Sequence, residues 1–315
     1  MKTTFAFILS ICVVLPAHAQ PQYEKIDSFA RNFKASYTDA ADLARQLTEP
    51  FQTDGEKARA LFAWVAEHIR YDYAKYKDGL SKVRFSGQTM EEMEQQQEEW
   101  HEDQIRATLR KKKGVCSDYS RLYQRMCEVA GVECVTISGS TRSLRGRGGK
   151  HAWNAVRIDD KWRLVDVTWG AGYIDDDTDK FIRRFSPGFF DTPPELLILD
   201  HLPNEEKWQL LDQPVSKPDF KKQPLVNYGS GDFGLQAFAP ADGKLQKTNG
   251  KAEIRLKLGN PPPALIVVAG MRREIPVEVE KTDDGWTVLT FSPGMASDIH
   301  VFGGKGRKLQ WLARF

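Results

Sequence analysis

The chain has 315 residues and nearly balanced charges, with 45 Lys and Arg against 43 Asp and Glu. Nucleic-acid binding needs a basic surface, so this balance argues against nucleic acid as a partner. The length is sufficient for two domains.

The first 19 residues have the pattern of a secretory signal. Lys2 precedes an apolar run over residues 5–15, and the sequence AHA at 17–19 is a small-residue cleavage site. The run is too short for a membrane anchor, which needs about 20 apolar residues. We therefore expect cleavage of residues 1–19, no transmembrane segment, and an exported mature chain, periplasmic or extracellular.

The cysteine count points to one reactive thiol. Cys12 falls in the predicted signal, so Cys116, Cys127 and Cys134 remain. An odd number of cysteines in an oxidising compartment indicates a free reactive thiol or an intermolecular bridge. Cys127 and Cys134 form either a disulfide or two buried thiols, and their spacing is not that of a C-x-x-C redox pair.

Two helices are predicted before Cys116. Residues 53–73 open with Thr53 and Glu56 at capping-box spacing, and apolar residues then recur at helical intervals. Residues 90–113 are acidic at their start and basic at their end, which is typical of a solvated helix.

A third helix is predicted to begin at Cys116 itself. Apolar residues recur from Tyr119 to Ala130, and Gly131 is a stop signal. A thiol at a helix N-terminus lies in the positive field of the backbone dipole, and the lysines at 111–113 add to that field. Both effects favour the thiolate, so Cys116 is a candidate nucleophile if a base lies beside it.

Strands are predicted over residues 132–138, 151–158 and 162–169. The loop between the first two strands contains Arg142, Arg145 and Arg147 but lacks the spacing of a phosphate loop. We expect this loop to be solvated.

The second and third strands form a predicted hairpin that supplies the base. A turn of two residues (Asp159 and Asp160) or of four (158–161) sets three pairs across the hairpin: Ile158 with Lys161, Val156 with Arg163, and His151 with Thr168. In this register His151 and Asp166 share one face of the sheet and are diagonal neighbours. A three-residue turn would instead send Asp166 to the opposite face.

These residues are the groups that thiol catalysis requires. Cys116 attacks a carbonyl, His151 holds its proton and delivers it to the leaving amine, and Asp166 fixes the imidazole tautomer and stabilises its charged form. We therefore predict a Cys116-His151-Asp166 triad. His68 and His201 have no partners at metal-ligand spacing, so the sequence predicts no metal site and no cofactor.

The C-terminal part has a different pattern. Residues 213–232 mix Pro, Lys, Gly and Ser without periodicity and are predicted to be a linker that follows a catalytic domain over 20–212. Short alternating segments then predict a small β-sandwich of immunoglobulin-like type over 233–315. No catalytic constellation lies there, and this domain is a candidate surface for a protein partner.

The sequence resembles the transglutaminase-like superfamily, and specifically its kyphoscoliosis peptidase type. Three segments carry the resemblance: KKGVCSDYSRLYQRMCEVAGVECVTISG, KHAWNAVRIDDKWRLVDVTWG and TDGEKARALFAWVAEHIRYDY. It extends over roughly residues 38–215.

The resemblance implies an α+β, papain-like core in which a helix bearing the thiol packs on an antiparallel sheet. It also implies that Cys116, His151 and Asp166 are the triad. The charged segment at 86–110 is longer than the family leads us to expect, which raises the question of whether it covers the cleft.

The resulting hypothesis is an exported cysteine enzyme that forms a thioester from an amide of a protein or peptide substrate. Water as the acceptor gives a peptidase or deamidase-like hydrolase, which we favour because nothing in the sequence marks a site for an amine donor. Two alternatives stay open: transglutaminase-type acyl transfer to amines, and a non-catalytic protein-binding scaffold.

Overall fold

The computed structural model describes residues 13–14, 23–79, 85–87, 89–143, 148–175, 177–228, 233–270, 272–305 and 308–315. Three parts of the sequence predictions lie outside the described residues: the signal peptide apart from Val13 and Val14, the loop positions Arg145 and Arg147, and the end of the linker at 229–232. Among the helices of the described part, none has the length and apolar character needed to cross a membrane.

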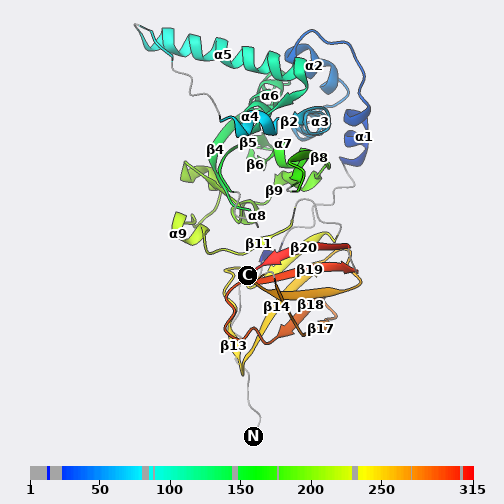
Figure 1. Ribbon diagram of the computed structural model, residues 1–315. Helices are drawn as coiled ribbons and strands as arrows, with labels where there is room; N and C mark the ends of the chain where they lie inside the picture. Colours follow the sequence, from blue (N-terminus) through cyan, green and yellow to red (C-terminus); the bar gives the residue numbers. More distant parts are fainter. Residues whose placement is uncertain are drawn as a thin grey trace.

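The N-terminal part is built of helices around α6. The helices are α1 (Glu24–Asn32), α2 (Ala40–Thr48), α3 (Asp54–His68), α4 (Tyr73–Lys77), α5 (Met90–Lys111), α6 (Cys116–Val129), α7 (Val167–Ala171), α8 (Pro194–Leu197) and α9 (Lys217–Phe220). The predicted capping box is present at the start of α3, where Thr53 and Glu56 bond each other's backbone. The charged helix α5 is mostly exposed, as its composition predicts, and projects at one end of the molecule (Figure 1).

An antiparallel sheet packs against α6. Its strand order is β10-β4-β5-β6-β9, and the strands are β4 (Cys134–Thr141), β5 (Lys150–Ile158), β6 (Lys161–Val165), β9 (Phe190–Thr192) and β10 (His201–Pro203). Asn154 on β5 is fully buried and donates from its side-chain amide to the carbonyl of Ser120 on α6, at 3.1 Å. This bond ties the sheet to the helix that begins at Cys116, and the predicted α+β class is confirmed.

The predicted β5-β6 hairpin is confirmed in its turn and register. Asp159 and Asp160 have φ of 50° and 58°, as a two-residue turn of the favoured hand requires, and Ile158 pairs with Lys161. The predicted extension of the second strand to Trp169 is wrong, because β6 ends at Val165 and the chain turns into α7. The pair between His151 and Thr168 is therefore not formed.

Four short strands and two 3-10 turns complete the N-terminal part. They are β2 (Arg70–Tyr71), β3 (Lys113–Gly114), β7 (Gly172–Asp175), β8 (Lys180–Arg183), η2 (Pro187–Phe189) and η3 (Glu206–Gln209). The parallel pair of β2 and β3 places Tyr71 opposite Gly114, two residues before Cys116.

The C-terminal part consists of two antiparallel sheets at the end of the molecule opposite α5 (Figure 1). One contains β1 (Val13–Val14), β12 (Leu235–Ala239), β13 (Lys247–Thr248), β14 (Lys251–Leu258), β17 (Val277–Lys281) and β18 (Trp286–Phe291). The other contains β11 (Leu225–Val226), β15 (Leu265–Ala269), β16 (Arg273–Ile275), β19 (Ile299–Lys305) and β20 (Lys308–Arg314). Both sheets contribute to one hydrophobic core.

The segment predicted as a linker is partly structured. Residues 217–220 form α9, and β11 pairs with β20 through Leu225 and Val226. The C-terminal sheet therefore begins before residue 233. The immunoglobulin-like assignment of this region stays a prediction.

Gly139 on β4 allows β10 to approach closely. A Cβ at this position would lie 2.3 Å from the Leu202 carbonyl oxygen and 2.4 Å from Cη2 of Trp153. Because the first of these atoms is backbone, Gly139→Ala should displace β10 and lower the free energy of unfolding by about 1–3 kcal/mol, measured by denaturant titration. Gly55→Ala, whose Cβ meets atoms at 3.4 Å or more, is the matched control and should not lower stability, because alanine is favoured over glycine in a helix such as α3. Equal stability of the two variants would contradict the tight packing of β10.

Candidate active site

Cys116 is the first residue of α6 and is 5% exposed. The start of the helix is fixed by Asp118, whose Oδ2 accepts a 2.9 Å hydrogen bond from the backbone N–H of Val115. Further along α6, the Tyr119 hydroxyl donates to the carbonyl of Ile69 at 2.7 Å. The thiol is therefore held at a fixed helix terminus.

The structure brings the three predicted triad residues together. His151 on β5 contacts Asp166 through Nε2 and Oδ2 at 2.7 Å, and a hydrogen bond joins His151 to the Cys116 thiol. Because Nε2 of His151 is bound to Asp166, Nδ1 is the nitrogen left for the thiol. Asp166 reaches His151 from the junction of β6 and α7, where it is the N-cap of α7.

Asp166 is fully buried, and its oxygens are saturated with donors. Oδ1 accepts from the backbone N–H groups of Thr168 at 2.8 Å and Trp169 at 3.0 Å. Burial alone would raise the pKa of this carboxyl, but the charge and hydrogen bond of His151 and the bond from His201 hold the pKa well below its usual range. Asp166 is therefore ionised at every pH near neutrality.

The pKa of Cys116 is lowered. Burial raises it, but the hydrogen bond and charge of His151 and a hydrogen bond from the Ala152 backbone N–H outweigh burial. Two of the lysines at 111–113, which are expected to favour the thiolate, are engaged elsewhere: Lys112 lies over the Trp64 ring at 4.3 Å, and Lys113 pairs with Asp72 at 2.9 Å.

The pKa of His151 is raised to about 10. Burial lowers this pKa, and the charge of Asp166, its hydrogen bond and the interactions with Cys116 raise it by more. A lowered thiol pKa beside a raised imidazole pKa favours a thiolate-imidazolium pair. That pair is the activated form of a cysteine nucleophile.

His201 is a member of the site that the sequence analysis missed. Its Nε2 contacts Oδ2 of Asp166 at 3.0 Å, and its Nδ1 contacts Oδ1 of Asp200 at 2.5 Å. The residue is 1% exposed and begins β10. The histidine and its preceding aspartate were the available sequence signal, but the pairing of β10 with β4 could not be predicted.

A group of three described residues could also hold a metal ion by its geometry. Their ligand atoms all lie within 4.8 Å of one another, and the residues are His151, Asp166 and His201. Two nitrogens and a carboxylate oxygen are ligands that zinc accepts. The same atoms are, however, joined in pairs at 2.7 and 3.0 Å. We assign the cluster to hydrogen bonding, because protons already satisfy each atom.

Cys127 and Cys134 are free and buried in the structure. The two thiols contact each other, and burial raises the pKa of Cys134 well above its usual value. Of the two alternatives left open by the sequence, the structure has the pair of buried thiols. Neither resembles the activated thiol at Cys116.

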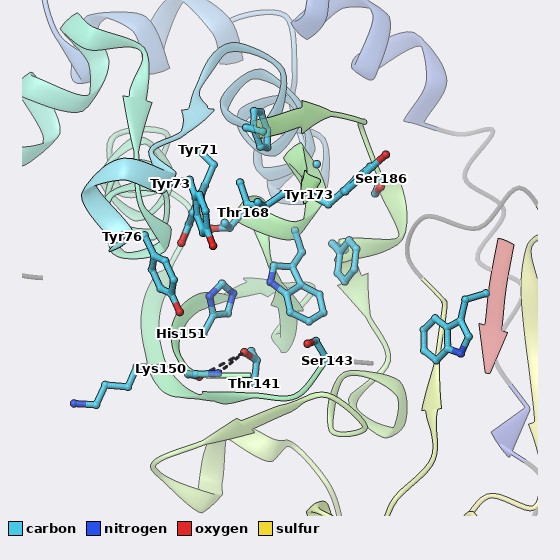
Figure 2. A pocket seen from close by; sticks show the side chains of 17 residues that line it. Tyr71, Tyr73, Tyr76, Thr141, Ser143, Lys150, His151, Thr168, Tyr173 and Ser186 are labelled. Carbon is cyan, nitrogen blue, oxygen red and sulfur yellow. Dashed lines mark hydrogen bonds between the residues drawn. The ribbon is translucent and has the colours of Figure 1, made fainter. Parts of the chain in front are cut away.

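An aromatic cleft of about 540 Å³ reaches the site at His151 (Figure 2). Figure 2 shows Tyr71, Tyr73 and Tyr76 along one side of His151. Trp169, Phe181 and Phe189 also line the cleft, and Trp311 contributes from β20 of the C-terminal part. None of the described residues of α5 lines this cleft, so the charged segment does not cover it there.

This geometry agrees with the family comparison. Residues 41–167 match the model of the transglutaminase-like superfamily, which confirms the resemblance seen in the sequence. The matched residues include Cys116, His151 and Asp166 and end before His201.

Within the superfamily, the chain is similar to the kyphoscoliosis peptidase of Homo sapiens. The two are 29% identical over 292 residues, which cover 90% of this chain and 41% of the human protein. Hillarin of Drosophila melanogaster is 26% identical over 261 residues, covering 75% of this chain and 29% of hillarin. The chain thus spans about two fifths or less of the length of these relatives.

Among solved structures, an arylamine N-acetyltransferase from Bacillus cereus, described as having a Cys-His-Glu triad, has a TM-score of 0.32 and 12% identity. The match covers 88% of this chain and 93% of that structure.

The pKa shifts predict how Cys116 reacts with iodoacetamide. His151→Ala removes the hydrogen bond and the charge of His151, the two largest causes that lower the thiol pKa, and leaves the burial that raises it. The labelling rate of Cys116 at pH 7 should therefore fall by about 10–100-fold. Only the thiolate reacts, and once the thiol pKa lies above 7, each further pKa unit lowers the thiolate fraction at pH 7 about tenfold. Peptide mapping by mass spectrometry measures the rate, with Cys127 and Cys134 as internal controls. A wild-type Cys116 that labels no faster than those two thiols would contradict the ion pair.

Proposed function

We propose that the chain is an exported cysteine-dependent amide hydrolase that acts on protein or peptide substrates. The observation that supports this function best is the chain of contacts from the Cys116 thiol through His151 to the buried Asp166, beside a substrate-sized cleft. Export rests on the composition of residues 1–19. Cleavage there would remove β1 and leave β12 at the edge of its sheet.

The proposed reaction has two halves. The Cys116 thiolate attacks the amide carbon, and the proton on His151 moves to the leaving nitrogen as the C–N bond breaks, which gives a thioester and a free amine or ammonia. Water then attacks the thioester while His151 takes its proton. The C–S bond breaks, the carboxylic acid leaves, and the Cys116 thiolate and the His151 imidazolium are regenerated.

Two groups are available for the oxyanion that forms at the attacked carbonyl. The backbone N–H of Cys116 is in the first turn of α6, where the helix does not use it. Tyr71 lines the cleft, and its pKa is raised first by burial and then by the nearby Cys116, so its hydroxyl stays protonated and able to donate. Tyr71 is therefore the proposed second donor.

The lining of the cleft supports a peptide substrate with a bulky apolar side chain next to the reactive amide. Tyr, Trp and Phe are eight of the 17 lining residues, and their rings gain from covering such a side chain. Thr168 lines the same wall and is 7% exposed, and its hydroxyl has no hydrogen-bond partner among the described residues. A buried unpaired hydroxyl costs free energy until a partner arrives, which a substrate backbone group would supply.

The acceptor is assigned to water. The described lining residues include Lys150 but no Asp or Glu. A cationic amine donor would therefore find no carboxylate in that wall to pair with, whereas water needs no site of its own. Acyl transfer to an amine remains the alternative reaction of the same thioester.

A peptide-library experiment tests the function. Wild-type protein and Cys116→Ala are incubated with casein or glutamine-containing peptides, with and without a primary amine. Hydrolysis predicts new peptide termini or a mass gain of about 1 Da on glutamine, whereas transfer predicts amine addition with a loss of about 17 Da. Both signals should vanish in Cys116→Ala. Full alkylation of Cys116 without turnover of any peptide would favour the non-catalytic scaffold.

Tyr71→Phe tests the oxyanion assignment. Loss of one oxyanion donor lowers kcat by about 10²-fold, and the rate of Cys116 alkylation should change little because the triad is intact. Tyr73→Phe, a change of the same type in the same cleft, should keep kcat within about threefold of wild type. If Tyr71→Phe lowered the alkylation rate as much as kcat, the hydroxyl would act on the thiol and not on the oxyanion.

A further inference from the structure

The contacts of Asp166 continue beyond the triad into a buried network. From Asp166 Oδ2 the path runs to Nε2 of His201 at 3.0 Å, and from Nδ1 of His201 to Oδ1 of Asp200 at 2.5 Å. The hydroxyl of Tyr228 donates to the same oxygen of Asp200 at 2.7 Å. His201 thus lies between two carboxylates, one of which is the triad aspartate.

The two carboxylates decide the protonation of His201. An ionised carboxylate accepts hydrogen bonds and does not donate, whereas a neutral imidazole has one N–H only. Since both ring nitrogens of His201 face carboxylate oxygens, both must carry a proton. The Asp200 oxygen that faces Nδ1 also accepts from the Tyr228 hydroxyl, so we take it as an acceptor on both sides. His201 is therefore a buried imidazolium.

We infer that His201 is a positioning residue: a fixed cation that holds Asp166 between two imidazole rings and sets the charge that Asp166 presents to His151. This inference rests on the proposed function, because the pKa values that His201 changes are those of the proposed catalytic triad. It adds a fourth residue that lies beyond the matched family domain. His201 is not itself among the residues that line the cleft, and it contacts Asp166 directly, so we assign its effect to Asp166.

The groups that face His201 come from several elements. They are His151 on β5, Asp166 at the start of α7, Asp200 next to it in the chain, and Tyr228. Arg142 at the end of β4 lies near Asp200 and partly balances its charge. The rings of Trp153 and Trp169 cover His201 at centroid distances of 5.1 and 4.4 Å and keep water away.

The cation has a predictable effect on the triad. A positive charge beside Asp166 offsets part of the field that the carboxylate exerts on His151, so the imidazolium of His151 releases its proton more readily. The same charge stabilises the Cys116 thiolate. Removing the charge should therefore raise both pKa values and move the pH window of the ion pair to higher pH. Burial lowers the pKa of His201 itself, but Asp200 and Asp166 raise it by more, which agrees with the cationic form.

The test is the pH profile of Cys116 alkylation by iodoacetamide in the full chain, which needs no substrate. His201→Gln keeps an N–H donor toward Asp166 but carries no charge. Its profile should move alkaline by about 0.5–1 pH unit, so that on the acid limb, where the rate still rises with pH, alkylation is about 3–10-fold slower than in wild type. His68→Gln is the matched control, because His68 bonds the Trp64 carbonyl and no carboxylate, and its profile should coincide with that of wild type.

The outcomes separate this inference from the proposed function. A residue with a merely structural role would lower the amount of folded protein without moving the profile, so an unshifted profile in folded His201→Gln overturns the inference. If wild-type Cys116 itself reacts no faster than a free peptide thiol, the proposed function fails, whatever His201 does.

A second measurement uses the unmodified protein and covers the case in which the variant does not fold. In ¹⁵N-histidine-labelled wild type, both ring nitrogens of His201 should keep the shifts of an imidazolium at pH 8. The signal is assigned through its contact with the Trp169 ring, whose centroid lies 4.4 Å away. A neutral tautomer at that pH would overturn the inference.

Discussion

The site depends on one buried carboxylate. Asp166 has no exposed surface, and a buried carboxylate is stable only when charges and hydrogen bonds replace its lost hydration. Four donors do so: two backbone N–H groups at Oδ1 and two imidazole rings at Oδ2. A carboxylate has about four acceptor positions, so Asp166 has no freedom to rotate. His151 is held in place as a consequence, and with it the ionised form of Cys116.

The fold supplies these donors through a change of secondary structure at one residue. Because β6 ends at Val165 and α7 begins at Val167, Asp166 directly follows the second strand of the hairpin and is also the N-cap of α7. A continued strand would leave the backbone N–H groups of Thr168 and Trp169 in the sheet ladder, unavailable to Oδ1. The two roles of Asp166, as a helix cap and as a triad member, are therefore one arrangement.

The local parts of this arrangement were predictable from the sequence, and the distant parts were not. The capping box of α3, the start of α6 at Cys116 and the turn at Asp159-Asp160 all follow from spacings of a few residues. The register of the hairpin then placed His151 near Asp166. His201 escaped prediction because it reaches Asp166 only when β10 pairs with β4, some 60 residues earlier. Alternation also could not indicate where β6 would stop, since Val167 and Trp169 continue a strand-like pattern.

The network also connects the two parts of the molecule. Tyr228, which closes the path through Asp200, packs against the hydrophobic cores of both parts. Trp311 on β20 lines the cleft from the other side of the same boundary. A shift of the C-terminal sheets would therefore move one wall of the cleft and, through Tyr228, Asp200 and His201, the hydrogen bonding of Asp166. The C-terminal strands are thus structurally coupled to the site, although they contribute no residue to the triad itself.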